Sequence, residues 1–399
     1  MSQLCITLPP FSPDYSGVAS ALFELGGMIV IHDASGCTGN YLGYDEPRWM
    51  NSQAMVYCSG LRHMDAVLGN DSKLVKRIVA AAESLKPRFI ALLGSPVPMI
   101  IGTDYKGIAA ELENKTGIPA FGFDTKGIEF YDKGITAASI ALLERFAPAG
   151  KSYKKLTGTI NITGLTPLDF GNRGNAEDFA SVFKRNGISI NTSFSMGMNL
   201  DEVVLAPCAE LDVAVSQAGV ETAKYMQRTY GIPYISGVPL GDGSSLTEAV
   251  KDILHKKNSF LNVSSTSMSH SHKHILIAGE QVIACSIRNE LRLKYGCKDI
   301  SVAVLFNASE ELLERNDYTL VTEEKLCELL NSGMFTDVVA DPLIEQLIKI
   351  RGVRFFGLPH TAVSSKVYWD ETERFVSHDM ELLLKKIAEI GGVRNEKKQ

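Results

Sequence analysis

The chain has 399 residues, of which 45% are hydrophobic and 22% are charged. At about 150 residues per domain this length predicts two or three domains, and the composition excludes a disordered chain or a small disulfide-rich module. The 40 basic residues against 46 acidic residues leave a formal charge of −6, so we expect neither nucleic acid nor an anionic membrane surface as a partner.

Short apolar runs alternate with turns and amphipathic stretches along the whole chain, a pattern typical of parallel sheets flanked by helices. Seven of these runs predict strands, at residues 28–31, 89–93, 159–162, 211–215, 274–278, 300–306 and 336–340. Residues 118–123 repeat the same strand-and-turn pattern. Helices are predicted over residues 72–84, 103–115, 175–186, 218–229, 281–294 and 341–350.

Two polar stretches divide the chain into units of domain size. Residues 147–155 are small and basic, and residues 262–274 are rich in serine. We therefore expect three Rossmann-like α/β domains, each with a mainly parallel sheet flanked by helices, at 1–150, 151–265 and 266–357. The C-terminal tail, 358–399, is expected to complete the first domain.

Three features of the sequence indicate the cellular compartment of the protein: its N-terminus, its apolar runs and its cysteines. No basic region followed by an apolar one opens the chain, so no secretory signal is predicted. Gly or Pro interrupts each apolar run before it reaches the roughly 20 residues of a membrane-spanning helix. We therefore expect a cytoplasmic protein, in which the seven scattered cysteines are mostly free thiols.

The first predicted domain contains a candidate metal-binding thiol. Cys37 follows the strand at 28–31 in a turn with Gly36 and Gly39, which places it at the carboxyl edge of a sheet, where α/β proteins build sites. A thiolate at this position can ligate an iron–sulfur cluster. The alternative is that Cys37 is a small apolar residue packed beneath the turn.

An ordered set of segments carries a resemblance to a known family. In the first domain these are the turn around Cys37, the loop Asp65–Gly69 and the segment Ile100–Asp104. The set continues with Ile160–Gly164, Met198–Glu202, Leu211–Val215, Ile277–Gly279 and Asp337–Leu343. Over nearly its whole length the chain resembles the nitrogenase component 1 superfamily. That superfamily includes nitrogenase molybdenum-iron protein subunits, a cofactor-assembly scaffold, dark-operative protochlorophyllide reductase and nickel-sirohydrochlorin reductive cyclase.

The resemblance implies an iron–sulfur cluster, of the [4Fe-4S] type, held at a subunit interface by cysteines from three loops of the first domain. Cys37, next to Gly36, matches the second loop, whereas the first and third loops have Asp14 and Ser95 in place of cysteine. One chain therefore cannot hold the cluster, and a homodimer would need help from Cys58, Asp14 or Cys5. A paralogous partner with three cysteines would complete the ligand set, so we favour a heteromeric assembly over self-association.

The resemblance also bears on the substrate. Dinitrogen-reducing members hold a large metal cofactor through a cysteine in the second domain and a histidine in the third. No cysteine stands around Val215, Ser216 and Gln217, which disfavours dinitrogen reduction, although His360 lies near the histidine position. His360 can line a substrate cavity as a proton donor or a ligand, because imidazole titrates near neutral pH. A loop-end histidine bonded to backbone explains the residue equally well.

The sequence contains no GxxxxGK[ST] motif, so we expect no nucleotide hydrolysis by this chain. The resemblance implies instead that a separate, ATP-dependent P-loop iron protein delivers electrons. We expect a component 1 subunit of a low-potential oxidoreductase that works anaerobically as a dimer or tetramer on a small molecule or a tetrapyrrole. Two alternatives stay open, a non-catalytic scaffold for metal-cluster assembly and a tetrapyrrole- or metal-chelate-binding protein.

Overall fold

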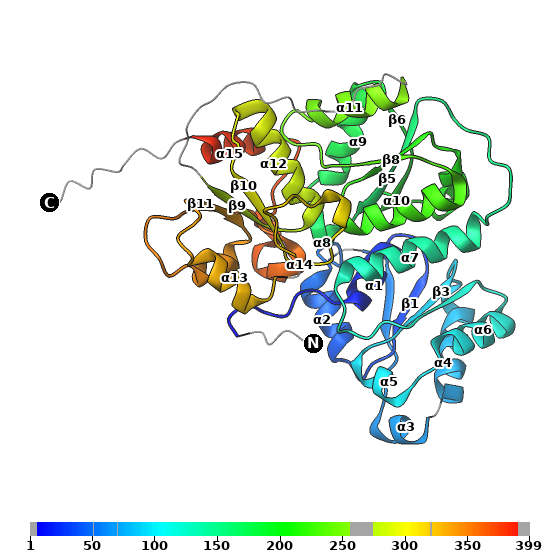
Figure 1. Ribbon diagram of the computed structural model, residues 1–399. Coiled ribbons are helices and arrows are strands. Elements are labelled where there is room, and N and C mark those ends of the chain that lie inside the picture. The colour runs from blue at the N-terminus through cyan, green and yellow to red at the C-terminus, as the bar shows by residue number, and fades with distance from the viewer. Residues whose placement is uncertain (1–5, 51, 70, 256–273, 320, 390–399) are drawn as a thin grey trace.

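The computed structural model describes residues 6–50, 52–69, 71–255, 274–319 and 321–389. Its strands form three four-stranded parallel sheets, each flanked by helices, and the three units lie side by side as separate lobes (Figure 1). This arrangement confirms the predicted α/β class. Among the described residues, no helix combines the length and the apolar character that crossing a membrane requires.

The first sheet has the strand order β2-β1-β3-β4. Its two central strands are buried along their whole length, because helices cover both faces of a parallel sheet. The strands are β1 (Met28–Ile31), β2 (Met55–Cys58), β3 (Ile90–Leu93) and β4 (Ala120–Phe123). The helices are α1 (Asp14–Leu22), α2 (Gly36–Asn40), the π-helical η1 (Tyr41–Asp45), α3 (His63–Leu68), α4 (Asp71–Leu85), α5 (Pro96–Ile101), α6 (Tyr105–Thr116) and α7 (Tyr131–Phe146).

The second sheet repeats this topology with the order β6-β5-β7-β8. Its strands are β5 (Thr159–Leu165), β6 (Ser189–Ser195), β7 (Leu211–Ala214) and β8 (Tyr234–Ser236). The helices around it are α8 (Pro167–Phe170), α9 (Asn175–Arg185), the 3-10 helix η2 (Leu200–Cys208), α10 (Gln217–Tyr230) and α11 (Ser244–Leu254).

The third sheet has the order β10-β9-β11-β12. Its strands are β9 (Ile275–Gly279), β10 (Ile300–Val304), β11 (Asp337–Ala340) and β12 (Arg354–Gly357). The helical segments are α12 (Gln281–Tyr295), η3 (Glu310–Leu312), α13 (Glu323–Leu330), η4 (Pro342–Leu347), α14 (Thr361–Ser364), η5 (Ser365–Glu371) and α15 (His378–Ala388).

Each of the three sheets therefore has a topological switch point at the same place in its strand order. The first strand of each pairs with the second strand on one side and with the third on the other. In such sheets a crevice opens at the carboxyl ends of the first and third strands, and ligands commonly bind there. The residues that follow β1 and β3, and those that follow β9 and β11, are therefore candidates for ligand binding.

One predicted helix is wrong. Residues 341–350 form only the short 3-10 helix η4, over Pro342–Leu347. The Asp341 side chain caps it by accepting from the Leu343 N–H at 2.9 Å. Beyond it the side-chain oxygen of Asn331 accepts from the Lys349 N–H at 2.6 Å, so this N–H is bonded outside any helix. The side chain of a distant residue therefore takes the hydrogen bond that a longer helix would have used.

Helices α1 and α7 pack backbone against backbone through two glycines. A Cβ atom added to Gly17 would lie 1.9 Å from the Tyr131 carbonyl oxygen, and one added to Gly134 would lie 1.9 Å from the Asp14 carbonyl oxygen. Only residues without a side chain allow this approach. We call this contact the glycine seam, and it fixes the position of the first turn of α7.

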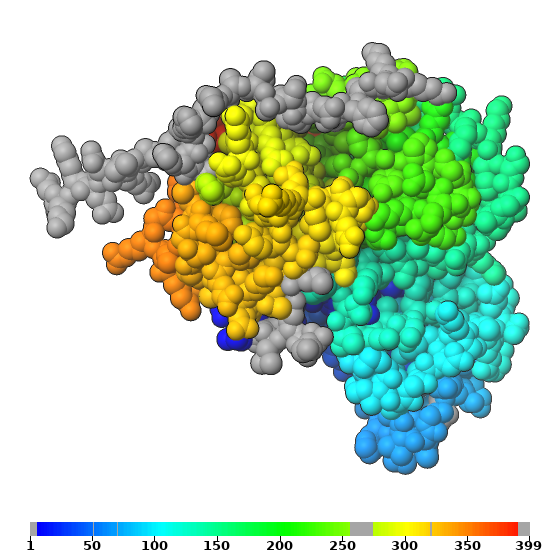
Figure 2. Space-filling model, in the orientation of Figure 1, coloured from blue at the N-terminus to red at the C-terminus, as the bar shows by residue number. Residues whose placement is uncertain are grey.

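The C-terminal segment contacts more than one lobe. The 3-10 helix η5 lies against η1 of the first lobe, whereas α15 packs on α12 of the third. Figure 2 shows the three lobes packed against one another, with blue atoms of the N-terminal part visible in the indentation between the first and third lobes. Helix α8 of the second lobe contacts both α14 and α1 of the first lobe, so the three lobes converge on a common junction.

Candidate functional site

Cys37 lies at the switch point of the first sheet. The chain leaves β1 through His32 and Asp33 and then starts α2, where the backbone N–H of Cys37 donates to the Asp33 carboxylate at 2.8 Å. This bond satisfies one of the free N–H groups that every helix start presents. Cys37 is half-buried, and Cβ atoms built on Gly36 and Gly39 would meet no atom within 4 Å. The thiol therefore has open backbone on both sides of it.

Two hydroxyl groups lie beside the thiol. Tyr15 comes from α1 and Ser95 precedes α5, directly after β3, and hydrogen bonds from both hydroxyls favour the ionised sulfur. Burial and the Asp33 carboxylate act more strongly in the opposite direction, so the pKa of Cys37 is raised. Ser95 is completely buried, and the single hydrogen of its hydroxyl has the His32 carbonyl oxygen, at 2.8 Å, as its other acceptor. The structure thus brings Cys37 and Ser95 together.

Asp14 is placed next to this pair but its carboxylate is occupied. Its two oxygens accept from the backbone N–H groups of Tyr15 at 2.8 Å, Lys126 at 2.8 Å and Gly127 at 2.7 Å. Burial nevertheless raises its pKa. In this arrangement Asp14 anchors the loop between β4 and α7, and a role as a metal ligand would require these three hydrogen bonds to be given up.

Cys58 ends β2, directly opposite Ile31 of β1. Its thiol donates to the Asp33 carbonyl at 3.2 Å and accepts from the Gly60 N–H at 3.3 Å. Both candidate thiols therefore adjoin Asp33, one through its side chain and the other through its carbonyl. Cys5 lies outside the described residues, and the six described cysteines are all free thiols.

Apolar side chains are exposed along α5, the helix that follows Ser95, and in the loop after Gly127. Val97, Ile100 and Ile101 are 46%, 78% and 41% exposed. Ile128, 66% exposed, follows Gly127, which packs against Pro96. We call these four residues the apolar rim. Exposed apolar groups of this size on one face are typical of a surface that another protein covers.

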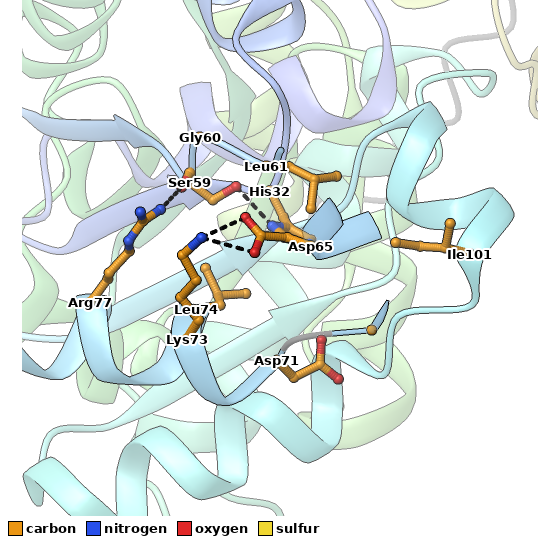
Figure 3. A pocket seen from close by; sticks show the side chains of 11 residues that line it. His32, Ser59, Gly60, Leu61, Asp65, Asp71, Lys73, Leu74, Arg77 and Ile101 are labelled. Atoms are coloured by element: carbon orange, nitrogen blue, oxygen red, sulfur yellow. Dashed lines mark hydrogen bonds and ion pairs between the residues drawn. The ribbon is translucent and has the colours of Figure 1, made fainter. Parts of the chain in front are cut away.

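A small polar cavity of about 20 Å³ lies beside His32 and is lined by residues of α3 and α4 and by Ile101 at the end of α5 (Figure 3). His32 points into it and bonds through Nδ1 to the Ser59 hydroxyl at 2.8 Å, and burial lowers its pKa. Lys73 holds both oxygens of Asp65 at 2.8 Å, and Arg77 donates to the Ser59 carbonyl. Lys73 and Asp65 thus form an ion pair at this cavity, whereas Arg77 bonds to the backbone.

A second cluster lies where the three lobes meet. Asp169 of α8 accepts a short hydrogen bond from the hydroxyl of Tyr131, the first residue of α7, and one from the Thr166 hydroxyl at 3.2 Å. His360, which precedes α14, places Nε2 3.2 Å from the same Asp169 oxygen that Tyr131 contacts. The aromatic ring of Phe306 packs on both partners, with centroids 5.4 Å from His360 and 5.0 Å from Tyr131.

The switch point of the third sheet adjoins this cluster. Glu280 follows β9 and Asp341 follows β11, and both line a cavity of about 20 Å³ together with His360. Burial and the charge of Asp169 raise the pKa of Glu280 to about 8. Burial also raises the pKa of Asp341, whose carboxylate accepts from the His360 N–H at 2.8 Å. Such a volume holds one water molecule, since a water needs roughly 10–15 Å³.

Sequence reasoning missed three members of this cluster, Asp169, Tyr131 and Glu280. The signal that could have found two of them is an acidic residue shortly after an apolar strand, since Asp169 follows β5 and Glu280 follows β9. Within the described residues, no group of three or more His, Cys, Asp and Glu side chains is arranged to hold a metal ion. The described part of one chain thus offers Cys37 and Cys58 as candidate thiols but no complete ligand set.

Comparison with known proteins shows which protein family the chain matches. Residues 14–305 match the family described as nitrogenase component 1 type oxidoreductase. The nitrogenase iron-molybdenum cofactor biosynthesis protein NifE of Rhodobacter capsulatus is 26% identical over 231 residues, which cover 56% of this chain and 47% of that protein. The nitrogenase molybdenum-iron protein alpha chain of Methanosarcina barkeri is 25% identical over 51% of this chain and 37% of its own length.

One of the light-independent protochlorophyllide reductase polypeptides of Angiopteris evecta is 22% identical over 49% of this chain and 39% of its own length. The chain therefore spans less than half the length of these curated relatives. A solved structure of nitrogenase Cp1 at pH 6.5 superposes with a TM-score of 0.69 at 11% identity, and covers 96% of this chain and 93% of the other. This last likeness establishes the fold.

Proposed function

Because the chain belongs to the nitrogenase component 1 type oxidoreductases, we propose that it is one subunit of a low-potential, ATP-dependent reductase. A separate P-loop iron protein supplies the electrons, and a [4Fe-4S] cluster at a subunit interface receives them. The acceptor is a small molecule or a tetrapyrrole, and dinitrogen is not the substrate. The observation that carries this proposal is the placement of Cys37, half-buried at the switch point of the first sheet, with open backbone around it.

The donor set fits a shared cluster. Cys37 is a half-buried thiol with two hydroxyl groups beside it, and there is open space over Gly36 and Gly39 for a bulky inorganic group. Iron–sulfur clusters are held by four cysteine thiolates or by a mixed set. Cys37 supplies one ligand in this proposal, and a partner subunit supplies the others.

The residues around Cys37 have defined tasks in such a site. When bound, an iron–sulfur cluster takes up and releases one electron at a time. Asp33 fixes the backbone of Cys37, and hydrogen bonds from Tyr15 and Ser95 withdraw negative charge from the sulfur. Hydrogen bonds to cluster sulfurs are one of the ways in which a protein sets the reduction potential.

The apolar rim supports a partner on this face of the molecule. Val97, Ile100 and Ile101 belong to α5, which begins directly after Ser95, and Ile128 follows Gly127, which packs against Pro96 at the start of that helix. Covering apolar side chains is favourable by roughly 25 cal/mol per Å² of buried surface. We propose a paralogous subunit as this partner, or a second copy of the chain, so that the cluster lies between the two subunits.

Anaerobic purification with and without a co-expressed paralogue tests the proposal. We expect the complex to contain iron and sulfide, to show a reduced-cluster EPR signal when the iron protein and ATP are added, and to lose both in Cys37→Ala because a thiolate ligand is removed. Cys285→Ala removes a thiol of the third lobe, bonded to Leu312, and serves as the control that keeps its iron.

Cys58→Ala shows whether the second thiol of the first lobe contributes a ligand. Loss of iron in this variant would assign Cys58 to the cluster, and unchanged iron would restrict it to its bond with Asp33. Absence of iron from every combination of chains, or full retention of iron in Cys37→Ala, would contradict the proposed function.

A scaffold for metal-cluster assembly is the second candidate. It is supported by the similarity to NifE, which is described as a cofactor biosynthesis protein, and by the lack, within the described residues, of any group of three or more metal-binding side chains. A cluster that forms on the complex but is not reduced by the iron protein with ATP would favour the scaffold. The third candidate is a protein that binds a tetrapyrrole or metal chelate without redox turnover. Such a protein would bind the added tetrapyrrole or chelate, and it would contain no iron with or without the paralogue.

A further inference from the structure

Cys37 lies in a helical segment that is α-helical at its start and π-helical at its end. α2 passes directly into η1, because Asn40 and Tyr41 at the join both keep helical backbone angles. The Tyr41 N–H donates to the Cys37 carbonyl, which bonds the thiol-bearing residue to the first residue of the π-helix. π-Helical turns occur frequently at functional sites. We call residues 36–45 the thiol segment, and whatever holds its end also determines where Cys37 lies.

The thiol segment ends in a buried carboxylate, that of Asp45, which is 2% exposed. Its Oδ1 accepts from the hydroxyls of Ser12 at 3.0 Å and Ser365 at 3.2 Å. Its Oδ2 accepts from the Ser16 hydroxyl at 2.7 Å and from the Asn40 amide at 3.4 Å. Two donors on each oxygen satisfy a carboxylate that burial has removed from water, and they fix its orientation.

Two of these donors tie the thiol segment to α1. Ser16 lies in α1 next to Tyr15, whose hydroxyl bonds to the Cys37 sulfur. Ser12 precedes α1, and its backbone N–H donates to the Ala362 carbonyl of α14 at 2.9 Å. Through these serines, the group that anchors the end of the segment is bonded to the same helix that contacts the thiol.

Ser365 reaches Asp45 from a strained backbone conformation. It follows α14 with φ 51° and ψ −138°, which glycine adopts readily but a residue with a Cβ atom does not. Such strain persists only where the surroundings enforce it, and it is found at ligand sites and switches. η5, which begins at Ser365, lies against η1. The C-terminal segment of the third lobe is therefore bonded to the thiol segment of the first lobe at a strained residue.

Glu46, the next residue after the thiol segment, adds a local anchor. Its carboxylate accepts from the Tyr41 hydroxyl at 2.9 Å and from the Ser20 hydroxyl at 3.0 Å, and it pairs with Arg48 at 2.7 Å. These partners all belong to the first lobe. Glu46 therefore keeps the segment folded when a contact with the third lobe is removed.

We propose that Asp45 and Ser365 are positioning residues that fix the end of the thiol segment and so determine how deeply the Cys37 thiol is buried. The inference rests on the proposed function, in which Cys37 is a cluster ligand. At its start the segment is held by Asp33, which accepts from the Cys37 N–H at 2.8 Å. Without the Ser365 bond, contacts within the first lobe alone hold the other end, and the half-buried thiol becomes more accessible.

Alkylation of Cys37 tests the positioning role without any cluster or partner. The full-length chain, purified anaerobically and free of iron, reacts with iodoacetamide, and peptide mass spectrometry gives the rate at each cysteine. Ser365→Gly removes the hydroxyl but relieves the strain, so the free energy of unfolding should stay close to that of the parent. We nevertheless expect the Cys37 rate to rise by about two- to tenfold, the factor that the loss of one hydrogen bond gives.

Two references separate positioning from general loosening of the fold. The rate at Cys208, which ends η2 in the second lobe, should stay unchanged in Ser365→Gly. Ser152→Gly, the same substitution at an exposed site of the stretch 147–155, should change neither rate. A merely structural role of Ser365 would accelerate Cys208 together with Cys37.

Asp45→Ala is the larger perturbation, because all four hydrogen bonds to the carboxylate are lost. Its Cys37 rate should exceed that of Ser365→Gly, and Asp45→Asn, which keeps one accepting oxygen, is expected to restore part of the protection. Ser365→Gly decides if Asp45→Ala does not fold. The proposal is overturned if either variant alkylates Cys37 at the parent rate, or if Cys208 accelerates to the same extent.

The assembled complex separates this inference from the proposed function. In Ser365→Gly the complex should lose iron to a chelator faster than the parent complex by a similar factor, because a less firmly held thiolate dissociates more readily. Equal rates of iron loss would overturn the role of Ser365 at the cluster. Failure of the parent complex to bind iron would instead contradict the proposed function, while the alkylation rates would still test the positioning of Cys37.

Discussion

Asp212 is a buried carboxyl group with one unsatisfied oxygen. β7 places it beside Asn161, whose amide donates to one oxygen at 2.7 Å, whereas the other has no partner among the described residues. Burial raises the pKa of Asp212 to about 7. The folded state thus favours the protonated form, so its stability falls as pH rises from the unfolded carboxyl pKa to about 7, and is constant above that.

We expect Asp212→Asn to remove this loss of stability at rising pH, since the amide is neutral at every pH. The free energy of unfolding of the variant, relative to the parent, should rise by about 1–3 kcal/mol between roughly pH 4.5 and pH 8. Urea unfolding at both pH values measures it. Glu248→Gln, at an exposed position of α11, is the control for which no such change is expected. An equal difference at the two pH values would contradict the prediction.

At the scale of single residues, the sequence indicates Cys37 and His360 but not their partners. Both stand out by residue type and by their position after a strand. Tyr131, Asp169 and Glu280 each occupy the start of a helix, where such residues are common for local reasons. Their convergence depends on how three lobes pack, and no local pattern in the sequence encodes that packing.

At the scale of elements, the central strands are more predictable than the edge strands. The seven apolar runs correspond to β1, β3, β5, β7, β9, β10 and β11, and residues 118–123 contain β4. The four remaining strands, β2, β6, β8 and β12, all lie at a sheet edge. An edge strand is partly exposed and mixes polar with apolar residues, as in the sequence SINTSFS of β6, so hydrophobicity alone does not reveal it.

The glycine seam gives a prediction at this scale. Gly17→Ala would place a methyl group against the Tyr131 carbonyl, and neither helix backbone can withdraw without disturbing the other contact at Gly134. We expect a loss of about 1–3 kcal/mol in the free energy of unfolding, typical of overpacking. Gly39→Ala in α2 has open space and should be neutral or slightly stabilising. Chemical denaturation of both variants measures the two free energies of unfolding. Equal stability of Gly17→Ala and Gly39→Ala would contradict the prediction.

At the scale of the whole molecule, the first lobe exposes apolar surface along α5. Among the described residues, the rim residues belong to no core cluster, and Ile100 is the most exposed of them at 78%. Packing within the described part of the chain does not account for this surface, and the proposed partner subunit would cover it. This sequence alone does not identify the partner, because association depends equally on the surface of the other subunit.

We therefore expect Ile100→Lys to weaken association with the paralogue, or with a second copy, by at least about tenfold, since a charge would be buried without a partner. The melting temperature of the isolated chain should not change, because the side chain is exposed. Analytical ultracentrifugation measures the association, with Leu293→Lys on α12 as the control at an exposed site of the third lobe. Association that survives Ile100→Lys would place the interface elsewhere.

The glycine seam ties the surroundings of Cys37 to the junction of the three lobes. α1 carries Tyr15, next to Cys37, and α7 begins with Tyr131, which binds Asp169. Because their backbones touch, α1 cannot move toward α7 without displacing Tyr131 as well. The two tyrosines, one beside an exposed turn and the other in the interior, are therefore held at a fixed separation by two residues that have no side chain.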